Sequence, residues 1–279
     1  MKNAILFLFL FVCSAQQACS SDAPDPIGGG DGGGETESQD VLFRDDFDTF
    51  DTKVWTKEAH PAGWVNQELQ IYDEAHVSVG KDGDRSVLIL TAERKAGGAI
   101  YSGRVNSKGK KSFRYGKVEA SIKLPSTANG LWPAFWMMGE GDKQWPACGE
   151  IDILEMGERG GISAGTQDRQ LNVAIHYGPS AAAHEQQYYT NKVAHSLQDG
   201  KYHTYRLEWD AKALTIYVDG ARFHAFDISQ NTYFHDNFYL LLNLAVGGSF
   251  TGITNASGIT ALPEGGRASM YVDWIKIFN

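Results

Sequence analysis

From Val41 onward, hydrophobic and polar residues alternate in short runs separated by turn-forming residues, and no segment keeps a helical period. Side chains of a β-strand point alternately to its two faces, so this alternation predicts half-buried strands. The predicted strands are residues 86–93, 114–124, 171–176, 202–210, 214–218, 239–244 and 269–278. Asp219-Gly220, between two of the apolar runs, predicts a tight hairpin turn.

Strands at this spacing, with no helices between them, predict an all-β fold in the form of an antiparallel β-sandwich. The sequence contains no internal repeat. Residues 41–279 are therefore interpreted as one domain, which is within the size range of such sandwiches.

One stretch departs from simple alternation, because residues 150–155 carry three carboxylates among apolar residues. Glu150 and Asp152 share one strand face, while isoleucines occupy the other face. Strict alternation would bury Glu155 with the isoleucines. A β-bulge at residues 153–154 would instead return Glu155 to the face of the other two acids.

Three carboxylates on one face are suited to acid/base and nucleophilic chemistry on sugars. Carboxyl groups about 5–5.5 Å apart suit a retaining glycosidase, and about 6.5–9.5 Å an inverting one. The three acids alone fit a solvated acidic edge strand equally well, so the surrounding sequence has to decide.

Several longer motifs accompany the acidic strand. They are W-V-N-Q-E-L-Q at 64–70, G-L-W-P-A-F-W-M at 130–137, A-I-H-Y-G at 174–178 and L-L-N-L-A-V-G-G at 241–248. With these motifs, residues 43–278 resemble the glycoside hydrolase family 16 endo-β-glucanases, in particular laminarinases and mixed-linkage β-1,3-1,4-glucanases. The resemblance implies a jelly roll with a substrate cleft across its concave sheet, and endo-acting, retaining hydrolysis of a β-glucan.

The resemblance also implies roles for the three acids. Glu150 matches the nucleophile and Glu155 the general acid/base. Asp152 would hydrogen-bond the nucleophile and help keep the two glutamate pKa values apart. No cofactor is required for this chemistry.

A hydrolase that cuts inside a polysaccharide must hold several sugars, whose apolar faces stack on aromatic rings. Trp132, Trp136 and Trp145 match aromatic residues that line sugar subsites in the family, whereas Trp209 and Trp274 are expected in the core. The candidates for binding sugar hydroxyls are Asn66, Glu68, Arg104, His176 and Asn243.

The resemblance leaves the substrate open. Residues 249–252 read S-F-T-G where the family often has a tryptophan-containing loop, so the linkage preference is not settled. One alternative is a hydrolase of algal galactans such as agar or carrageenan. Another is a glycan-binding surface lipoprotein without turnover, although that alternative predicts a missing acid and all three are present.

The N-terminus predicts export. A basic start at residues 1–3 and an apolar run at 4–12 are typical of a signal peptide. Cys19 follows a small residue after this run, which predicts lipoprotein processing with residues 1–18 removed. Two glutamines just before Ala18 keep ordinary signal-peptidase cleavage as the alternative.

Residues 19–40 are rich in Gly, Ser, Asp and Glu, and this composition predicts a flexible tether. The predicted location is a lipid-anchored position at the bacterial cell envelope or surface, or alternatively secretion. The net charge of −9 argues against a nucleic-acid partner. The expected partner is β-glucan, with membrane contact only through the lipid and a monomeric domain.

Two further expectations concern cysteine and calcium. With Cys13 in the signal and Cys19 lipidated, Cys148 has no disulfide partner and is expected to be a small buried hydrophobic residue. Family members commonly carry a structural calcium away from the cleft, and Asp46 and Asp273 are the candidate oxygen ligands.

Overall fold

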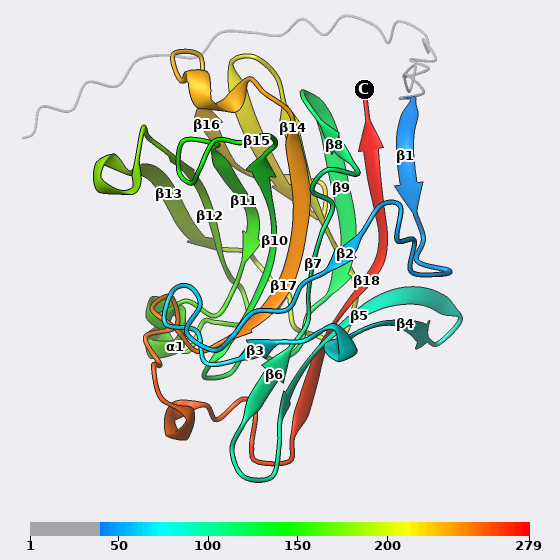
Figure 1. Cartoon of the computed structure of the whole chain (residues 1–279), viewed down its shortest axis with the longest axis vertical. Helices are drawn as coiled ribbons and strands as arrows, with labels where there is room; N and C mark the ends of the chain where they lie inside the picture. Colours follow the sequence, from blue (N-terminus) through cyan, green and yellow to red (C-terminus); the bar gives the residue numbers. More distant parts are fainter. Residues whose placement is uncertain (1–39) are drawn as a thin grey trace, which may run out of the picture. The chain divides into compact units, whose positions relative to one another are not determined.

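The computed structural model describes residues 40–279, which form two packed β-sheets (Figure 1). The predicted signal peptide, the Cys19 lipidation site and the tether up to residue 39 lie outside the described residues. Those three expectations therefore stay predictions. Among the described residues, no helix is long and apolar enough to cross a membrane.

The larger sheet has ten strands in the order β16-β15-β14-β9-β18-β5-β6-β3, with β1 beside β18 and β4 beside β5. The pairs are antiparallel except β3 with β6. The strands are β1 (Val41–Asp45), β3 (Ile71–Tyr72), β4 (Val77–Asp82), β5 (Arg85–Arg94), β6 (Ile100–Ser102), β9 (Gly116–Lys123), β14 (His203–Trp209), β15 (Ala213–Val218), β16 (Ala221–Asp227) and β18 (Arg267–Phe278).

The smaller sheet has eight strands in the order β13-β12-β11-β10-β17-β7-β2, with β8 beside β17. Its strands are β2 (Thr56–Lys57), β7 (Arg104–Asn106), β8 (Ser112–Phe113), β10 (Leu131–Gly139), β11 (Glu150–Glu155), β12 (Gln170–Tyr177), β13 (Glu185–Lys192) and β17 (Phe238–Val246). The helical segments are α1 (Arg159–Ala164), η1 (Glu74–His76), η2 (Ala181–Ala183), η3 (Thr232–Phe234) and η4 (Ala256–Gly258).

The all-β sandwich predicted from the alternation is confirmed. The seven predicted strands correspond to β5, β9, β12, β14, β15, β17 and β18. The Asp219-Gly220 turn joins β15 to β16, and both residues have positive φ values of 48° and 79°, as a two-residue hairpin turn of type I′ requires.

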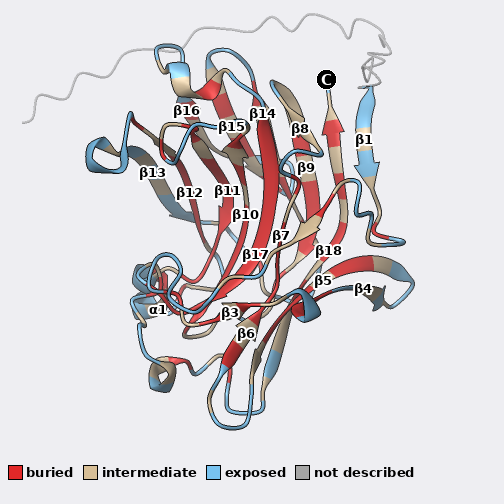
Figure 2. Ribbon diagram, viewed as in Figure 1, coloured by how far each residue is buried: buried red, intermediate tan, exposed pale blue. Residues whose placement is uncertain are grey.

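The core lies between the sheets, and Figure 2 shows buried residues concentrated along the central strands. On β17 every residue is buried, because one face meets the core and the other lies under the polar residues of the site. Cys148 is buried, as expected, and is a free thiol.

The prediction that both Trp209 and Trp274 belong to the core is only half right. Trp209 is 3% exposed and packs among core aromatic rings, whereas Trp274 is only partly buried. On β18 the isoleucines at 275 and 277 take the inner face, so Trp274 faces outward, where the Lys276 ammonium lies 3.9 Å from its ring centroid. The amphipathic indole is stabilised there by a cation instead of by the core.

Candidate active site

The three acids reach one face through the predicted bulge on β11. Phe135 pairs with Leu154 and Trp136 with Asp152, so residue 153 has no partner across the β10–β11 pair. The extra residue lets residues 153 and 154 both lie fully buried in the core. Glu155 returns to the face of Glu150 and Asp152, which confirms the bulge.

Two cavities meet at these acids, over the eight-stranded sheet. We call the first the polar cavity, and its volume is about 440 Å³. The residues that line this cavity but not the other are Glu158, Arg159, His176, His184, Gln186, Tyr188, Ser249 and Phe250. We call the second the aromatic cavity, and its volume is about 350 Å³. The residues that line this cavity but not the first are Trp64, Val65, Glu68, Arg104, Ala134, Trp136, Met138 and Asn243.

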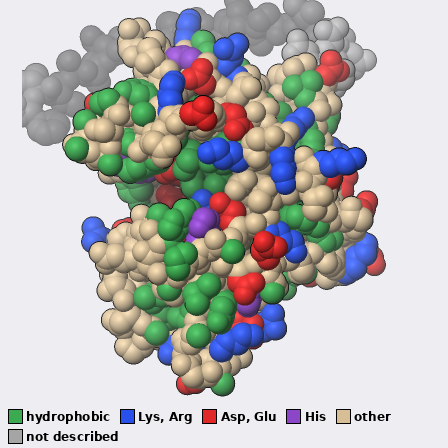
Figure 3. Space-filling view, in the orientation of Figure 1, with side chains coloured by type: hydrophobic (Ala, Val, Ile, Leu, Met, Phe, Trp, Pro, Cys, Tyr) green, Lys and Arg blue, Asp and Glu red, His purple; other side chains and the backbone are tan. Residues whose placement is uncertain are grey.

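The residues shared by both cavities mark their junction. They are Asn66, Trp132, Trp145, Glu150, Asp152 and Glu155. Figure 3 shows this face of the molecule hollowed, with acidic side chains lying deep among hydrophobic ones. The acids therefore lie midway along a groove and not at a closed end.

Glu155 is built to hold a proton. Its side chain is 9% exposed, and the Trp132 indole N–H donates to its Oε1 at 3.0 Å. Burial, followed by the negative charge of Asp152, raises the pKa of Glu155 well above the ordinary carboxyl value. A carboxyl that stays protonated near neutral pH is suited to act as a general acid.

Glu150 and Asp152 both lie close to one histidine ring nitrogen. His176 places Nε2 3.2 Å from Asp152 Oδ2 and 3.8 Å from Glu150 Oε1. Burial and the Asp152 charge raise the pKa of Glu150 to about 8, while His176 and Arg104 act in the opposite direction. Burial also raises the pKa of Asp152.

Three adjacent buried acids titrate as a set, because the charge on each opposes ionisation of the next. The three acids therefore carry fewer than three charges near neutral pH. A nucleophile must be ionised, so catalysis requires the state in which Glu150 is charged and the protons of the set lie on its neighbours.

His176 is itself held in place by a second histidine, which sequence reasoning missed. His176 Nδ1 lies 2.9 Å from His184 Nε2, and the rings stack with centroids 5.1 Å apart. Burial, and then the neighbouring His176, lowers the pKa of His184, so His184 stays neutral. No motif marks His184, because it reaches the site only through the β12–β13 connection.

In the aromatic cavity, Arg104 lies among aromatic rings. Its guanidinium carbon is 4.9 Å from the Trp136 ring centroid and 5.3 Å from that of Trp64. Arg104 also forms an ion pair with Glu58, which the sequence did not single out. The Arg104 side chain is buried, so it orients rings in addition to offering N–H groups to the cavity.

A hydrogen-bond chain fixes Trp136. Its indole N–H donates to Asn243 Oδ1 at 2.7 Å, and Asn243 Nδ2 lies 3.2 Å from the Tyr72 hydroxyl. That hydroxyl donates to Glu68, which also accepts from Asn66 at 3.1 Å. Asn243 and Glu68 line the cavity as predicted, but both already have protein partners and hold the tryptophan in place.

Comparison with known proteins agrees with this geometry. The Glycosyl hydrolases family 16 model matches residues 66–276, a span that contains all three acids. The chain belongs to glycosyl hydrolase family 16. This confirms the resemblance drawn from the motifs.

A structure of a Bacteroides ovatus mixed-linkage glucan PUL family 16 protein, in complex with a G4G4G3G product, is 70% identical. It covers 85% of this chain and 100% of that chain, with a TM-score of 0.85. The laminarinase catalytic domain from Thermotoga maritima is 28% identical, covers 87% of this chain and 99% of that chain, and has a TM-score of 0.72.

Among curated relatives, the glucan endo-1,3-beta-glucosidase A1 of Niallia circulans is 31% identical over 274 residues, which is 86% of this chain. This family 16 chain spans only 38% of that relative. It spans 30% of the clotting factor G alpha subunit of Tachypleus tridentatus, to which it is 29% identical over 78% of its own length.

The S-F-T-G segment of this family 16 chain contributes directly to the cleft. Phe250 stacks on Trp132, with ring centroids 4.4 Å apart and planes 14° apart. Phe250 therefore supports the indole that donates to Glu155. The sequence marked this segment only as a departure and did not assign its aromatic ring.

The remaining predicted tryptophan platform is accessible. Trp145 is 40% exposed at the junction of the two cavities, and its ring lies against His184 with centroids 4.8 Å apart. Trp64, at the far side, is 43% exposed and stacks on His60. Both indoles offer open surface for a sugar ring.

The two calcium candidates are already paired with cations. Asp46 accepts from Arg44 at 2.6 Å, and Asp273 pairs with Arg85. Neither belongs to a group of convergent ligand atoms among the described residues. As these side chains lie, they do not fit a ready calcium site, and calcium binding stays a prediction that requires displacement of the guanidinium groups.

Proposed function

We propose that this chain is an endo-acting, retaining β-glucanase that hydrolyses internal linkages of mixed-linkage β-1,3-1,4-glucan in preference to laminarin. The observation that carries the proposal is the position of the three acids at the junction of two cavities. Because the groove continues on both sides of the acids, a bound polymer is cut within its length.

The proposed reaction follows the division of protons. Glu155 donates its proton to the glycosidic oxygen while the Glu150 carboxylate attacks the anomeric carbon and forms a glycosyl-enzyme. Glu155, now ionised, takes a proton from water as that water releases the sugar from Glu150. His176 stabilises the Glu150 carboxylate and also contacts Asp152, through the distances given above.

The linkage preference rests on similarity. The Bacteroides ovatus protein, 70% identical along its entire length, is described as part of a mixed-linkage glucan system and was captured with a G4G4G3G product. Such high identity over the whole of that chain supports the same substrate class here. Lipid anchoring through Cys19, a location at the cell envelope and a monomeric state belong to the same proposal as untested parts.

The test compares purified protein on barley mixed-linkage glucan, laminarin and agarose, with viscosity and oligosaccharide products measured. A rapid fall in the viscosity of barley glucan, with slower laminarin hydrolysis, is the expected result. Products from agarose alone would assign the chain to galactan hydrolysis. Binding to barley glucan without products would indicate a glycan-binding protein.

A further inference from the structure

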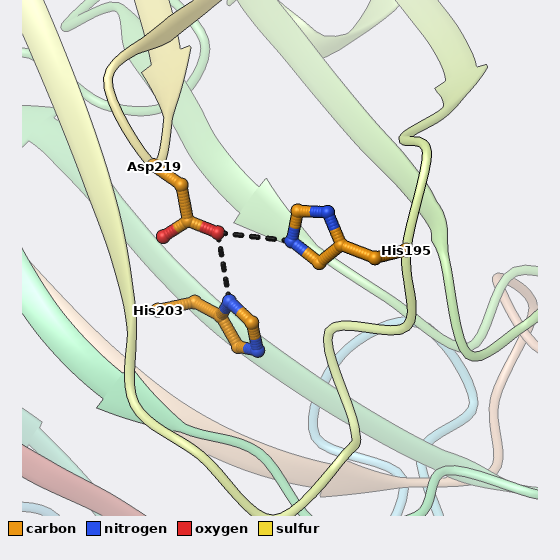
Figure 4. Close-up of side chains that lie close together, drawn as sticks. All are labelled: His195, His203 and Asp219. Atoms are coloured by element: carbon orange, nitrogen blue, oxygen red, sulfur yellow. Dashed lines mark hydrogen bonds and ion pairs between the residues drawn. The ribbon is translucent and has the colours of Figure 1, made fainter.

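A second cluster of ionisable side chains lies in the other sheet and shares no residue with the active site. His195 comes from the β13–β14 loop, His203 begins β14, and Asp219 forms the β15–β16 turn. Figure 4 shows both imidazoles directed at the Asp219 carboxylate. Their nitrogens and the carboxylate oxygen all lie within 4.8 Å of one another.

The distances resemble those between ligands of a small ion. Asp219 Oδ2 is 2.8 Å from His203 Nδ1 and 3.1 Å from His195 Nε2. Ligand atoms of a tetrahedral zinc site with bonds of 2.0–2.1 Å are about 3.3 Å apart. The two distances to Asp219 Oδ2 are therefore within a few tenths of an ångström of those in a zinc site, and all three atoms lie within 4.8 Å of one another.

The partners of His203 leave its Nδ1 facing an acceptor. Its Nε2 lies 3.1 Å from Asp199 Oδ1. Its Nδ1, on the other side of the ring, lies 2.8 Å from Asp219 Oδ2. A metal ion on Nδ1 would therefore leave the contact between Nε2 and Asp199 in place.

The two imidazoles converge on one carboxylate oxygen. The rings of His195 and His203 are stacked, with centroids 5.3 Å apart. One divalent ion satisfies both nitrogens and the carboxylate together. Asp199 would then act as the outer carboxylate that orients a metal-bound histidine.

The rest of the cluster is prearranged. The Thr204 N–H donates to Asp219 Oδ1 at 2.9 Å, which fixes the carboxylate with Oδ2 toward the histidines. The His203 side chain is 7% exposed and lies on the protein side of the site, whereas the His195 side chain is 53% exposed and lies on the solvent side. The open side leaves room for water as a fourth ligand.

We propose that His195, His203 and Asp219 form a structural binding site for a divalent transition-metal ion of the zinc class. Imidazole nitrogens with one carboxylate favour zinc over calcium or magnesium, which prefer all-oxygen ligands. The ion clamps the β13–β14 loop to the β15–β16 hairpin. It takes no part in glucan hydrolysis.

The experiment titrates ZnCl₂ into the purified, EDTA-treated protein by calorimetry and follows Tm in parallel. One Zn²⁺ per chain and a rise in Tm are expected. His195→Ala and Asp219→Asn should each lower the affinity for Zn²⁺ by at least about 100-fold. Asp199→Asn should lower it by about 10–100-fold. The matched control His224→Ala, also on the larger sheet, leaves the affinity unchanged.

A second measurement keeps the proposal testable if a variant unfolds. In wild-type protein, histidine ¹H–¹⁵N spectra should show zinc on Nδ1 of His203, and Co²⁺ should give the visible spectrum of a tetrahedral site. Absence of stoichiometric Zn²⁺ binding would overturn the proposal. So would binding that survives His195→Ala and Asp219→Asn but is lost in His176→Ala, because the ion would then lie among the catalytic acids.

Discussion

The two cavities that meet at the three acids of β11 are built on different principles. In the aromatic cavity, Trp136 is held by Asn243 and lies against Arg104, and both partners are buried. In the polar cavity, His176 depends on His184, which reaches it from the connection before the exposed edge strand β13. One half of the groove is a rigid stacking surface, and the other half carries groups that exchange protons.

The difference indicates a division of labour around one pair of glutamates. Sugar rings stacked in the aromatic cavity are positioned by surfaces that do not titrate. The larger opposing charge at the cleavage point comes from the polar cavity, where His176 lies within 3.8 Å of two carboxylates, and Arg104 of the aromatic cavity adds a smaller effect on Glu150. Changes in the two halves should therefore have different kinetic signatures.

The largest expected effect is at the junction itself. Glu155→Ala should reduce hydrolysis of barley glucan by about 10²–10⁴-fold, because the leaving oxygen is no longer protonated. An aryl β-glucoside oligomer with a good leaving group should still form the glycosyl-enzyme. Added azide should then restore turnover and give a β-glycosyl azide.

The matched variant at the junction is Glu150→Ala, which removes the nucleophile. Azide should enter the vacated space and give the α-azide by direct displacement. An α-azide from Glu155→Ala and a β-azide from Glu150→Ala would reverse the two roles. Early products of inverted configuration from the wild-type protein, measured by proton NMR, would reject the retaining mechanism.

In the aromatic cavity, Trp136→Ala should lower kcat/KM on barley glucan by about two- to tenfold, since a stacking contact contributes about 0.5–1.5 kcal/mol beyond area burial. Its Tm should change little, because the ring is only partly buried. The contrast is Trp209→Ala in the core, where the free energy of unfolding should fall by about 3–5 kcal/mol. A comparable loss of Tm in both variants would remove Trp136 from the sugar-stacking surface.

In the polar cavity, His184→Ala should lower kcat/KM about fivefold, as expected for the loss of one hydrogen bond worth about 1 kcal/mol. His176 stabilises the Glu150 carboxylate, so a poorly oriented His176 lets the pKa of Glu150 rise further. The acidic limb of the pH–rate profile should move to higher pH. An unchanged pH–rate profile would mean that His184 has only a packing role. The control is His184→Gln, which keeps an amide donor and should reverse part of the shift of the acidic limb.

The smallest effect concerns stability. Burial raises the pKa of Glu150 from 4.5 to about 8, so between these pH values the folded protein holds a proton that the unfolded chain has released. The free energy of unfolding therefore falls as pH rises through this window. Glu150→Gln removes this effect, and its Tm should exceed that of wild type by about 10 °C at pH 8 but match it at pH 4. An equal gain at both pH values would show that the gain does not come from the ionisation of Glu150.

Much of the fold could be predicted from local sequence. Alternation located the long strands, Asp219-Gly220 located a hairpin turn, and the mismatch between the period and the three acids located the bulge on β11. These features depend on residues close together in the chain. Periodicity did not locate β10 or β13, because one is buried along nearly its whole length and the other is mostly exposed.

For the site, the sequence predicted which residues carry the chemistry: Glu150, Asp152, Glu155 and the tryptophans of the long motifs. The structure brings these residues together around one groove. Tertiary structure alone decided which groups support them. His184 meets His176, Glu58 meets Arg104 and Phe250 meets Trp132 because separate strands and loops converge over one sheet. The same limit misplaced Trp274, since the face that a strand residue occupies depends on which neighbour the sheet packs against.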